Sequence, residues 1–154
     1  MPSPPLVIGI GTEERGDDGA GLVAARALRG RVPGRARIVE SHGDAAELLE
    51  LFRGSDSVWH IDAVRSGRAA GTVLRLVVGE SSLPSVGSPT STHAFSVAQA
   101  VGLGAAFGEL PKRLILYGVE AGSFAPGIGL SDAVRRGVDE IVLRLAGELA
   151  DRGS

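Results

Sequence analysis

The stretch LVIGIGTEERGDDGAG, residues 6–21, decides the fold of this chain. It opens with a continuous apolar run, LVIGI, which is typical of a strand covered on both faces. A glycine-rich turn follows this run. After the turn, apolar residues recur with helical spacing from Ala20 to Leu28, so they form one buried stripe. A strand, a turn and an amphipathic helix in this order predict the start of an α/β fold.

The same alternation continues to the end of the chain. Apolar runs predict four more strands, at 36–40, 57–62, 72–78 and 113–120. Helical stripes lie within 45–52, 94–101 and 134–145, and the expected N-caps are Asp44, Thr92 and either Ser131 or Asp132. We therefore expect an α/β three-layer sandwich around a mostly parallel, twisted five-stranded sheet. No internal repeat is present, so residues 1–154 are expected to form a single domain.

One connection predicts a strand of opposite direction. Only residues 63–71 separate the third strand from the fourth, and a parallel crossover needs about a dozen residues or more. The fourth strand should therefore run antiparallel to the third. The long polar stretch 79–92 would then return the chain to the carboxyl ends of the parallel strands.

Composition excludes several classes of partner. The net charge is −2 and no basic block is present, which argues against nucleic acid. No apolar run reaches the roughly 18 residues of a membrane helix, and the first residues lack the pattern of a signal peptide. Cysteine is absent, so disulfides, thiolate metal sites and a cysteine nucleophile are excluded. We expect a cytoplasmic protein.

The glycine turn fits neither nucleotide-binding motif. In the dinucleotide fingerprint, Glu14 stands where the third glycine belongs. Gly11 and Gly16 have the spacing of a P-loop, but Asp17 and Asp18 replace its lysine and its serine or threonine. Two carboxylates at this place repel a phosphate. A cation is the better candidate ligand for such a turn.

Three residues on separate elements are predicted to converge at the carboxyl ends of the strands. Asp18 follows the first strand, Asp62 ends the third, and His93 precedes the third helix. Two carboxylates and one imidazole suit a divalent transition metal. Each residue alone also has a structural interpretation, in which Asp17 or Asp18 caps a helix and Asp62 forms a turn.

Other polar residues near this edge have weaker cases. His42 and Asp44 could add ligands, although Asp44 also suits a helix cap. His60 shares a strand face with Asp62 and is interpreted as a packed histidine. Glu120 ends the fifth strand, where a solvated turn residue is the favoured interpretation.

Four motifs in order resemble the endopeptidases that mature the large subunit of nickel–iron hydrogenases. They are GIGTEERGDDGAG (9–21), DAVRSG (62–67), STHAF (91–95) and YGVEAGSF followed by GIGLSDAV (117–134). The resemblance implies that Asp18, Asp62 and His93 bind nickel and carry the catalytic site. It implies an enzyme that recognises nickel in the precursor large subunit and removes the C-terminal extension of that subunit. Nickel would come with the substrate, no organic cofactor would be needed, and we expect a monomer.

The chain departs from this family in two places. Thr12 stands where many relatives have asparagine, and ESHGD (40–44) replaces a common Asp-Gly-Gly-Thr. Neither change touches the three predicted ligands, but the second leaves the identity of the substrate open. A non-proteolytic metal-sensing or escort module with the same metal site is the alternative function. A glycosidase with paired carboxylates is a weaker one.

The sequence also constrains the peptidase mechanism. It contains no cysteine, no GxSxG and no HExxH, which argues against an acyl-enzyme and against a conventional zinc peptidase. Hydrolysis is therefore expected to depend on metal placement and on carboxylates that activate water. Asp17 is a candidate for orienting that water.

Overall fold

The structure, a computed structural model, describes residues 3–79, 94–127 and 129–152. Within these residues five strands form one sheet in the order β2-β1-β3-β5-β4. The strands are β1 (Leu6–Ile10), β2 (Arg37–Ser41), β3 (Ser57–Val64), β4 (Val73–Val77) and β5 (Arg113–Glu120). All neighbours are parallel except β4, which runs antiparallel to β5 at the edge of the sheet. The predicted sheet is confirmed.

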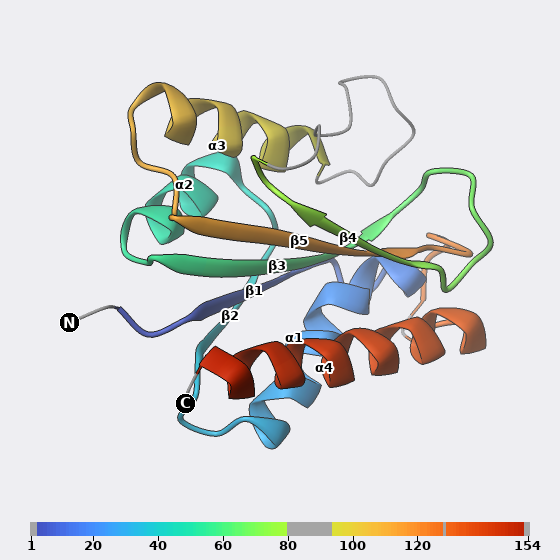
Figure 1. Cartoon of the computed structure of the whole chain (residues 1–154). Coiled ribbons are helices and arrows are strands. Elements are labelled where there is room, and N and C mark those ends of the chain that lie inside the picture. Colours follow the sequence, from blue (N-terminus) through green and yellow to red (C-terminus); the bar gives the residue numbers. More distant parts are fainter. Residues whose placement is uncertain (1–2, 80–93, 128, 153–154) are drawn as a thin grey trace.

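Helices cover both faces of this sheet. They are α1 (Ala20–Arg31), α2 (Ala45–Arg53), α3 (Ala94–Ala106) and α4 (Asp132–Arg152). Figure 1 shows α1 and α4 together on one face and α2 and α3 on the other. Each layer has its own apolar core, the first around Trp59 and Ile141 and the second around Ile8 and Phe52. These cores hold the three-layer sandwich together.

The fourth strand has the predicted direction. Because β4 is antiparallel to β5 and β5 is parallel to β3, β4 also opposes β3. The structure adds that β5 lies between the two strands, so the connection from β3 to β4 spans one strand position. No helix of the described residues has both the length and the apolar character that a membrane crossing requires.

Alternation along β3 sets the direction of its polar side chains. Trp59 and Ile61 belong to the core under α1 and α4, whereas Val58 belongs to the core under α2 and α3. Since successive side chains of a strand point to opposite faces, His60 and Asp62 face the α2 and α3 layer with Val58. Asp62 is thereby directed to the face on which α3 begins.

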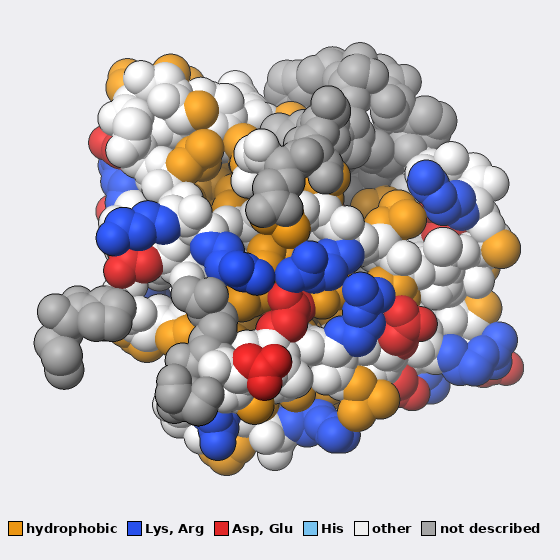
Figure 2. Space-filling model, in the orientation of Figure 1, with side chains coloured by type: hydrophobic (Ala, Val, Ile, Leu, Met, Phe, Trp, Pro, Cys, Tyr) orange, Lys and Arg blue, Asp and Glu red, His pale blue; other side chains and the backbone are white. Residues whose placement is uncertain are grey.

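A polar cluster joins α4 to the edge of the sheet. Glu148 accepts hydrogen bonds from Arg75 and from the Tyr117 hydroxyl, and the guanidinium of Arg144 lies 5.6 Å from the centre of the Tyr117 ring. Burial acts to raise the pKa of Glu148, but the bonds from Arg75 and Tyr117 outweigh it, so the pKa is lowered. Figure 2 shows basic side chains, with carboxylates between them, across the face between β4 and α4. These polar contacts connect α4 to β4 and β5 at the border of the apolar core.

Glycines allow α1 to approach the sheet closely. A Cβ atom at Gly21 would lie 2.1 Å from the carbonyl oxygen of Ile10 and 2.5 Å from that of Ile61. A Cβ at Gly9 would lie 2.3 Å from the carbonyl oxygen of Gly21. Real side chains do not fit at such distances, so Gly9 in β1 and Gly21 in α1 allow the two backbones to pack closely. Close packing of the backbone, and not the binding of a phosphate, therefore accounts for these two glycines.

The close approach generates the first prediction. Gly21→Ala should lower the free energy of unfolding by about 2 to 3 kcal/mol or more, because the added methyl group displaces α1 from β1 and β3. Gly30→Ala is the matched control, since Gly30 lies in the same helix with nothing within 4 Å. The control should raise stability by up to about 1 kcal/mol. Denaturant unfolding measures both, and similar stabilities for the two variants would contradict the packing argument.

Candidate functional site

The candidate site begins where β1 ends. The short 3-10 helix η1 (Gly16–Gly19) lies between β1 and α1 and contains Asp17 and Asp18. Backbone contacts fix it to the preceding turn, because Thr12 N donates to the carbonyl oxygen of Asp18 at 3.1 Å. A Cβ at Gly11 would lie 2.3 Å from this same oxygen, so only glycine fits there. The turn therefore positions η1 through backbone atoms.

Asp18 and Asp62 are both buried at the carboxyl edge of the sheet, with exposed fractions of 1% and 5%. Asp62 directly follows Ile61, whose carbonyl oxygen contacts the first turn of α1 at Gly21. Asp18 directly precedes that turn, and β1 and β3 are neighbouring parallel strands. One oxygen of Asp62 accepts a hydrogen bond from Ala63 N at 2.8 Å. The two carboxylates thus belong to one edge, as the sequence predicts.

The third predicted ligand, His93, lies outside the described residues, and so does the predicted cap Thr92. Within the described ranges, which end at 79 and resume at 94, no group of three or more His, Asp or Glu residues could hold a metal ion. The described α3 begins at Ala94, on the sheet face to which Asp62 is directed. The three-residue nickel site therefore stays a prediction.

Asp17 differs from its neighbour in being the attachment point of a loop. The residues 121–127 and 129–131 that follow β5 are called the post-β5 loop below. Asp17 Oδ2 accepts from the backbone N–H groups of Gly122 at 2.8 Å and Ser123 at 2.9 Å. Asp17 Oδ1 accepts from Ser131 N at 2.7 Å, and the Ser131 hydroxyl also donates to the carboxylate. One side chain therefore joins both ends of the loop to η1.

The donors around Asp17 determine its charge. Burial acts to raise the pKa of Asp17, but the N–H groups of Ser131, Ser123 and Gly122 and the Ser131 hydroxyl prevail, and the pKa is lowered. The carboxylate is charged and accepts hydrogen bonds from three backbone N–H groups and one hydroxyl, so the structure gives it a structural role, and its water-orienting role stays a prediction. The predicted helix cap is wrong, because Gly19 is the N-cap of α1 and no side chain bonds there.

The structure contradicts the prediction for Glu120 and confirms the one for His60. Glu120 is buried, and its carboxylate accepts from Ser66 N at 2.9 Å and from the Ser66 hydroxyl at 2.5 Å. The interpretation of Glu120 as a solvated turn residue is therefore wrong, since it joins the ends of β5 and β3. His60 is buried in the sheet, which confirms its interpretation as a packed histidine.

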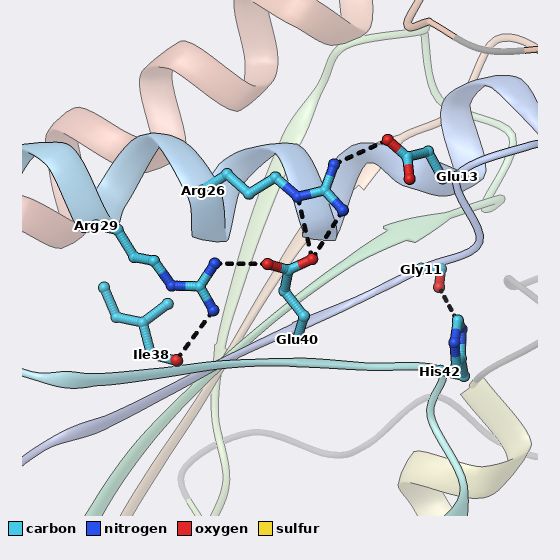
Figure 3. Close-up of polar contacts among 7 residues, drawn as sticks. All are labelled: Gly11, Glu13, Arg26, Arg29, Ile38, Glu40 and His42. Carbon is cyan, nitrogen blue, oxygen red and sulfur yellow. Dashed lines mark hydrogen bonds and ion pairs between the residues drawn. The ribbon is translucent and has the colours of Figure 1, made fainter.

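The unusual segment 40–44 has a structural account for its first residue. Figure 3 shows Glu40 between two arginines of α1, and its carboxylate binds Arg26 at 2.9 Å and Arg29 at 2.5 Å. Arg26 also binds Glu13 of the opening turn at 2.9 Å. Arg29 holds the pKa of Glu40 low despite its partial burial, and Arg26 adds to this effect. The network connects the opening turn, α1 and β2 at the surface.

The rest of the segment meets the opening turn and begins α2. His42 is exposed, and its Nδ1 lies 3.3 Å from the carbonyl oxygen of Gly11 (Figure 3). Asp44 caps α2, because its Oδ1 accepts from Ala46 N at 2.8 Å and from Glu47 N at 3.2 Å. The predicted cap is confirmed. The suggestion of Asp44 as an extra metal ligand stays a prediction, and His42 contacts the opening turn beside the candidate site.

Comparisons with known proteins agree with this fold. A family model described as hydrogenase maturation protease matches residues 23–148. Hydrogenase 2 maturation protease of Escherichia coli strain K12 is 27% identical over 152 residues, covering 96% of this chain and 92% of that protein. The structure of the hydrogenase maturating endopeptidase HybD from E. coli is 26% identical with a TM-score of 0.80, covering 98% of this chain and 94% of its own.

A second solved structure comes from an archaeon. The NiFe hydrogenase maturation protease HybD from Thermococcus kodakarensis is 27% identical with a TM-score of 0.77, covering 96% of this chain and 99% of its own. Fold and relatives together define a peptidase on an α/β sandwich. The chain belongs to the hydrogenase maturation protease family, whose model spans most of its length. The predicted family is confirmed, and a peptidase is favoured over an escort module.

Local sequence patterns predict neither of two contacts at this edge. The bonds of Asp17 to Ser131 and of Glu120 to Ser66 join residues far apart in the chain. Only the sheet order brings such partners together, so local patterns give no signal for them. A weak signal did exist for Asp17, because two adjacent aspartates are more than one helix cap requires.

The attachment of the loop generates the second prediction. Asp17→Asn should lower the free energy of unfolding at neutral pH by about 2 to 3 kcal/mol, because charge-assisted bonds are lost and an amide group faces buried donors. The folded-state pKa of Asp17 lies below its ordinary value of 3.8. Its stabilisation is thus present above about pH 4 and is lost as the pH falls through the lowered pKa.

Denaturant unfolding at neutral and acidic pH tests this dependence. The difference between wild type and Asp17→Asn should shrink as the pH falls below 4. Asp139→Asn, on the exposed side of α4, is the control and should change stability little at either pH. A difference of constant size across the acid range would contradict the charged state assigned to Asp17.

Proposed function

We propose that this chain is an endopeptidase that recognises nickel in the precursor large subunit of a nickel–iron hydrogenase and removes its C-terminal extension. The observation that carries the proposal is the pair of buried carboxylates, Asp18 and Asp62, at one edge of the sheet in a member of this protease family. Names of relatives support the substrate class, since one is a NiFe hydrogenase maturation protease.

The chemistry of the donors fits nickel as part of the substrate. Asp18 and Asp62 supply carboxylate oxygens, and His93 would supply an imidazole nitrogen, which is a donor set that divalent nickel accepts. Three protein ligands leave coordination positions for groups of the precursor. An incomplete set of ligands lets the enzyme recognise the ion without extracting it from the precursor. Nickel thereby marks a precursor that is ready for processing.

Burial of the two carboxylates also serves this recognition. Asp62 lies in β3, two residues before the strand ends, and Asp18 lies in η1, which backbone contacts fix in place. Little conformational entropy is then lost when a substrate binds. Carboxylate oxygens are suitable ligands for a divalent ion that the substrate brings. The site is complementary to a cation from another molecule.

Hydrolysis requires a water molecule, a base and a proton for the leaving amine. In the proposed reaction, a carboxylate of the site accepts a proton from water as the oxygen bonds to the scissile carbonyl carbon. The C–N bond then breaks, and that proton passes to the leaving nitrogen. Asp18, Asp62 and His93 are the proposed nickel-binding and catalytic residues, and the sequence contains no cysteine, no GxSxG and no HExxH.

The third prediction concerns the proposed site residues. Asp62→Asn and His93→Ala should each reduce processing of a nickel-loaded precursor by about 100-fold or more. Mass spectrometry of the precursor measures the released extension. Asp139→Asn removes an exposed carboxylate on α4 and should process at the wild-type rate.

The same experiment separates the alternative function. A metal-sensing or escort module would bind the nickel-loaded precursor without shortening it, so binding and cleavage are measured on the same sample. Thermal unfolding of each variant shows that the fold is retained. If Asp62→Asn or His93→Ala cleaves the precursor at the wild-type rate, the assignment of that residue is refuted.

A further inference from the structure

A pocket of about 210 Å³ opens at the carboxyl edge, between η1 and the post-β5 loop. Its walls consist mainly of backbone and small side chains, among them Gly16, Ser123, Ala125, Pro126 and Gly127. Sites for whole drug-sized ligands typically measure roughly 300 to 1,000 Å³. This pocket is smaller, so it suits a short part of a larger molecule.

The pocket walls are held rigidly. Asp17 binds both ends of the post-β5 loop through backbone N–H groups. Gly16 N donates to the carbonyl oxygen of Gly127 at 2.8 Å, and Gly127 N donates to that of Glu14 at 2.8 Å. These two bonds form a bridge of the kind found between parallel strands. The pocket is thus preformed and needs little ordering when it is filled.

A guanidinium group lies over an aromatic ring of the post-β5 loop. Arg65 stacks over the ring of Phe124, with 4.5 Å from its Cζ atom to the ring centre. Phe124 packs against the larger apolar core, and its chain neighbours Ser123 and Ala125 both line the pocket. Arg65 therefore lies over the residue of the post-β5 loop whose two chain neighbours line the pocket.

The charge of Arg65 is not neutralised by the described residues. Arg65 is exposed and forms no ion pair with any residue that the structure describes. Two carboxylates that bind the post-β5 loop and the residue after Arg65 are already engaged, since Asp17 binds this loop and Glu120 binds Ser66. A stacked guanidinium keeps its N–H edge available, and that edge matches the two oxygens of a carboxylate.

We propose that the pocket and the stacked Arg65 form one subsite for a peptide segment of the precursor. The segment places small residues in the pocket and one carboxylate on Arg65. This inference rests on the proposed function, because a peptide at this edge would lie beside Asp18, the chain neighbour of Asp17. The carboxylate belongs to an aspartate or glutamate side chain, or to the C-terminus of the segment.

Short fluorescein-labelled peptides of glycine and alanine are suitable probes. The reference peptide contains one aspartate and ends in a free carboxylate. Two further peptides each remove one of these charges, by asparagine in place of the aspartate or by an amide at the C-terminus. The fourth peptide carries both changes and is neutral at both places. Fluorescence anisotropy measures their dissociation constants. The dissociation constant of the doubly neutral peptide should be at least about tenfold higher than that of the fully acidic peptide. The two singly changed peptides identify which carboxylate Arg65 binds.

Variants of the enzyme test the two parts of the subsite. Arg65→Gln should weaken binding of the acidic peptide about tenfold and leave the doubly neutral peptide unchanged. Ala125→Leu should weaken all four peptides, because the larger side chain fills the pocket. Arg113→Gln is the matched control, since Arg113 is exposed at the opposite end of β5. The proposal is overturned if Arg65→Gln binds the acidic peptide like wild type, or loses equal affinity for the neutral peptide.

Cleavage of the nickel-loaded precursor separates this inference from the proposed function. Arg65→Gln should raise KM about tenfold with kcat within about twofold of wild type, as expected for a residue that only binds. If the precursor is not cut while the peptides depend on Arg65, the proposed function fails and the subsite stands. If the precursor is cut and Arg65→Gln leaves both constants unchanged, the subsite fails and the function stands.

Discussion

Close backbone contact between the opening turn and the sheet is the constraint on which the carboxyl edge depends. Gly9 and Gly21 let α1 lie directly on β1 and β3, and Gly11 lets the turn close on Asp18. No side chain fits at these three positions. Because the contacts involve backbone atoms, they leave little freedom in the position of η1. The placement of Asp18 beside the end of β3 follows from this packing.

Two adjacent aspartates in η1 have different environments. Asp17 is surrounded by N–H and O–H donors of the post-β5 loop, which keep it charged and hold the loop against η1. Asp18 is equally buried, but it lies on the chain just before the contact of α1 with Ile61. One carboxylate thus builds the wall of a pocket and the other is the proposed ligand of a metal. Because Asp17 and Asp18 are adjacent in η1, a substitution of either residue would be expected to shift the carboxylate of the other.

Charged side chains lie on both sides of the carboxyl edge, next to β2 and next to β5. On the β2 side, Glu40 connects two arginines of α1 and indirectly the opening turn, and His42 lies against Gly11 (Figure 3). On the β5 side, Arg65 lies on Phe124 beside a pocket with small walls. Family membership fixes the type of reaction, and these charged groups lie on either side of the edge where that reaction is proposed to take place.

The sequence by itself determined the elements, their order and the direction of β4. Apolar runs and helical stripes are local, and a strand of fixed direction follows from the length of one connection. The sequence also singled out Asp18 and Asp62 as carboxylates at strand ends. Only the tertiary structure decided the partners of Asp17 and Glu120, because Ser131 and Ser66 approach them through the order of strands in the sheet. Local patterns report what a residue tends to do, whereas hydrogen bonds between distant loops exist only once the sheet is assembled.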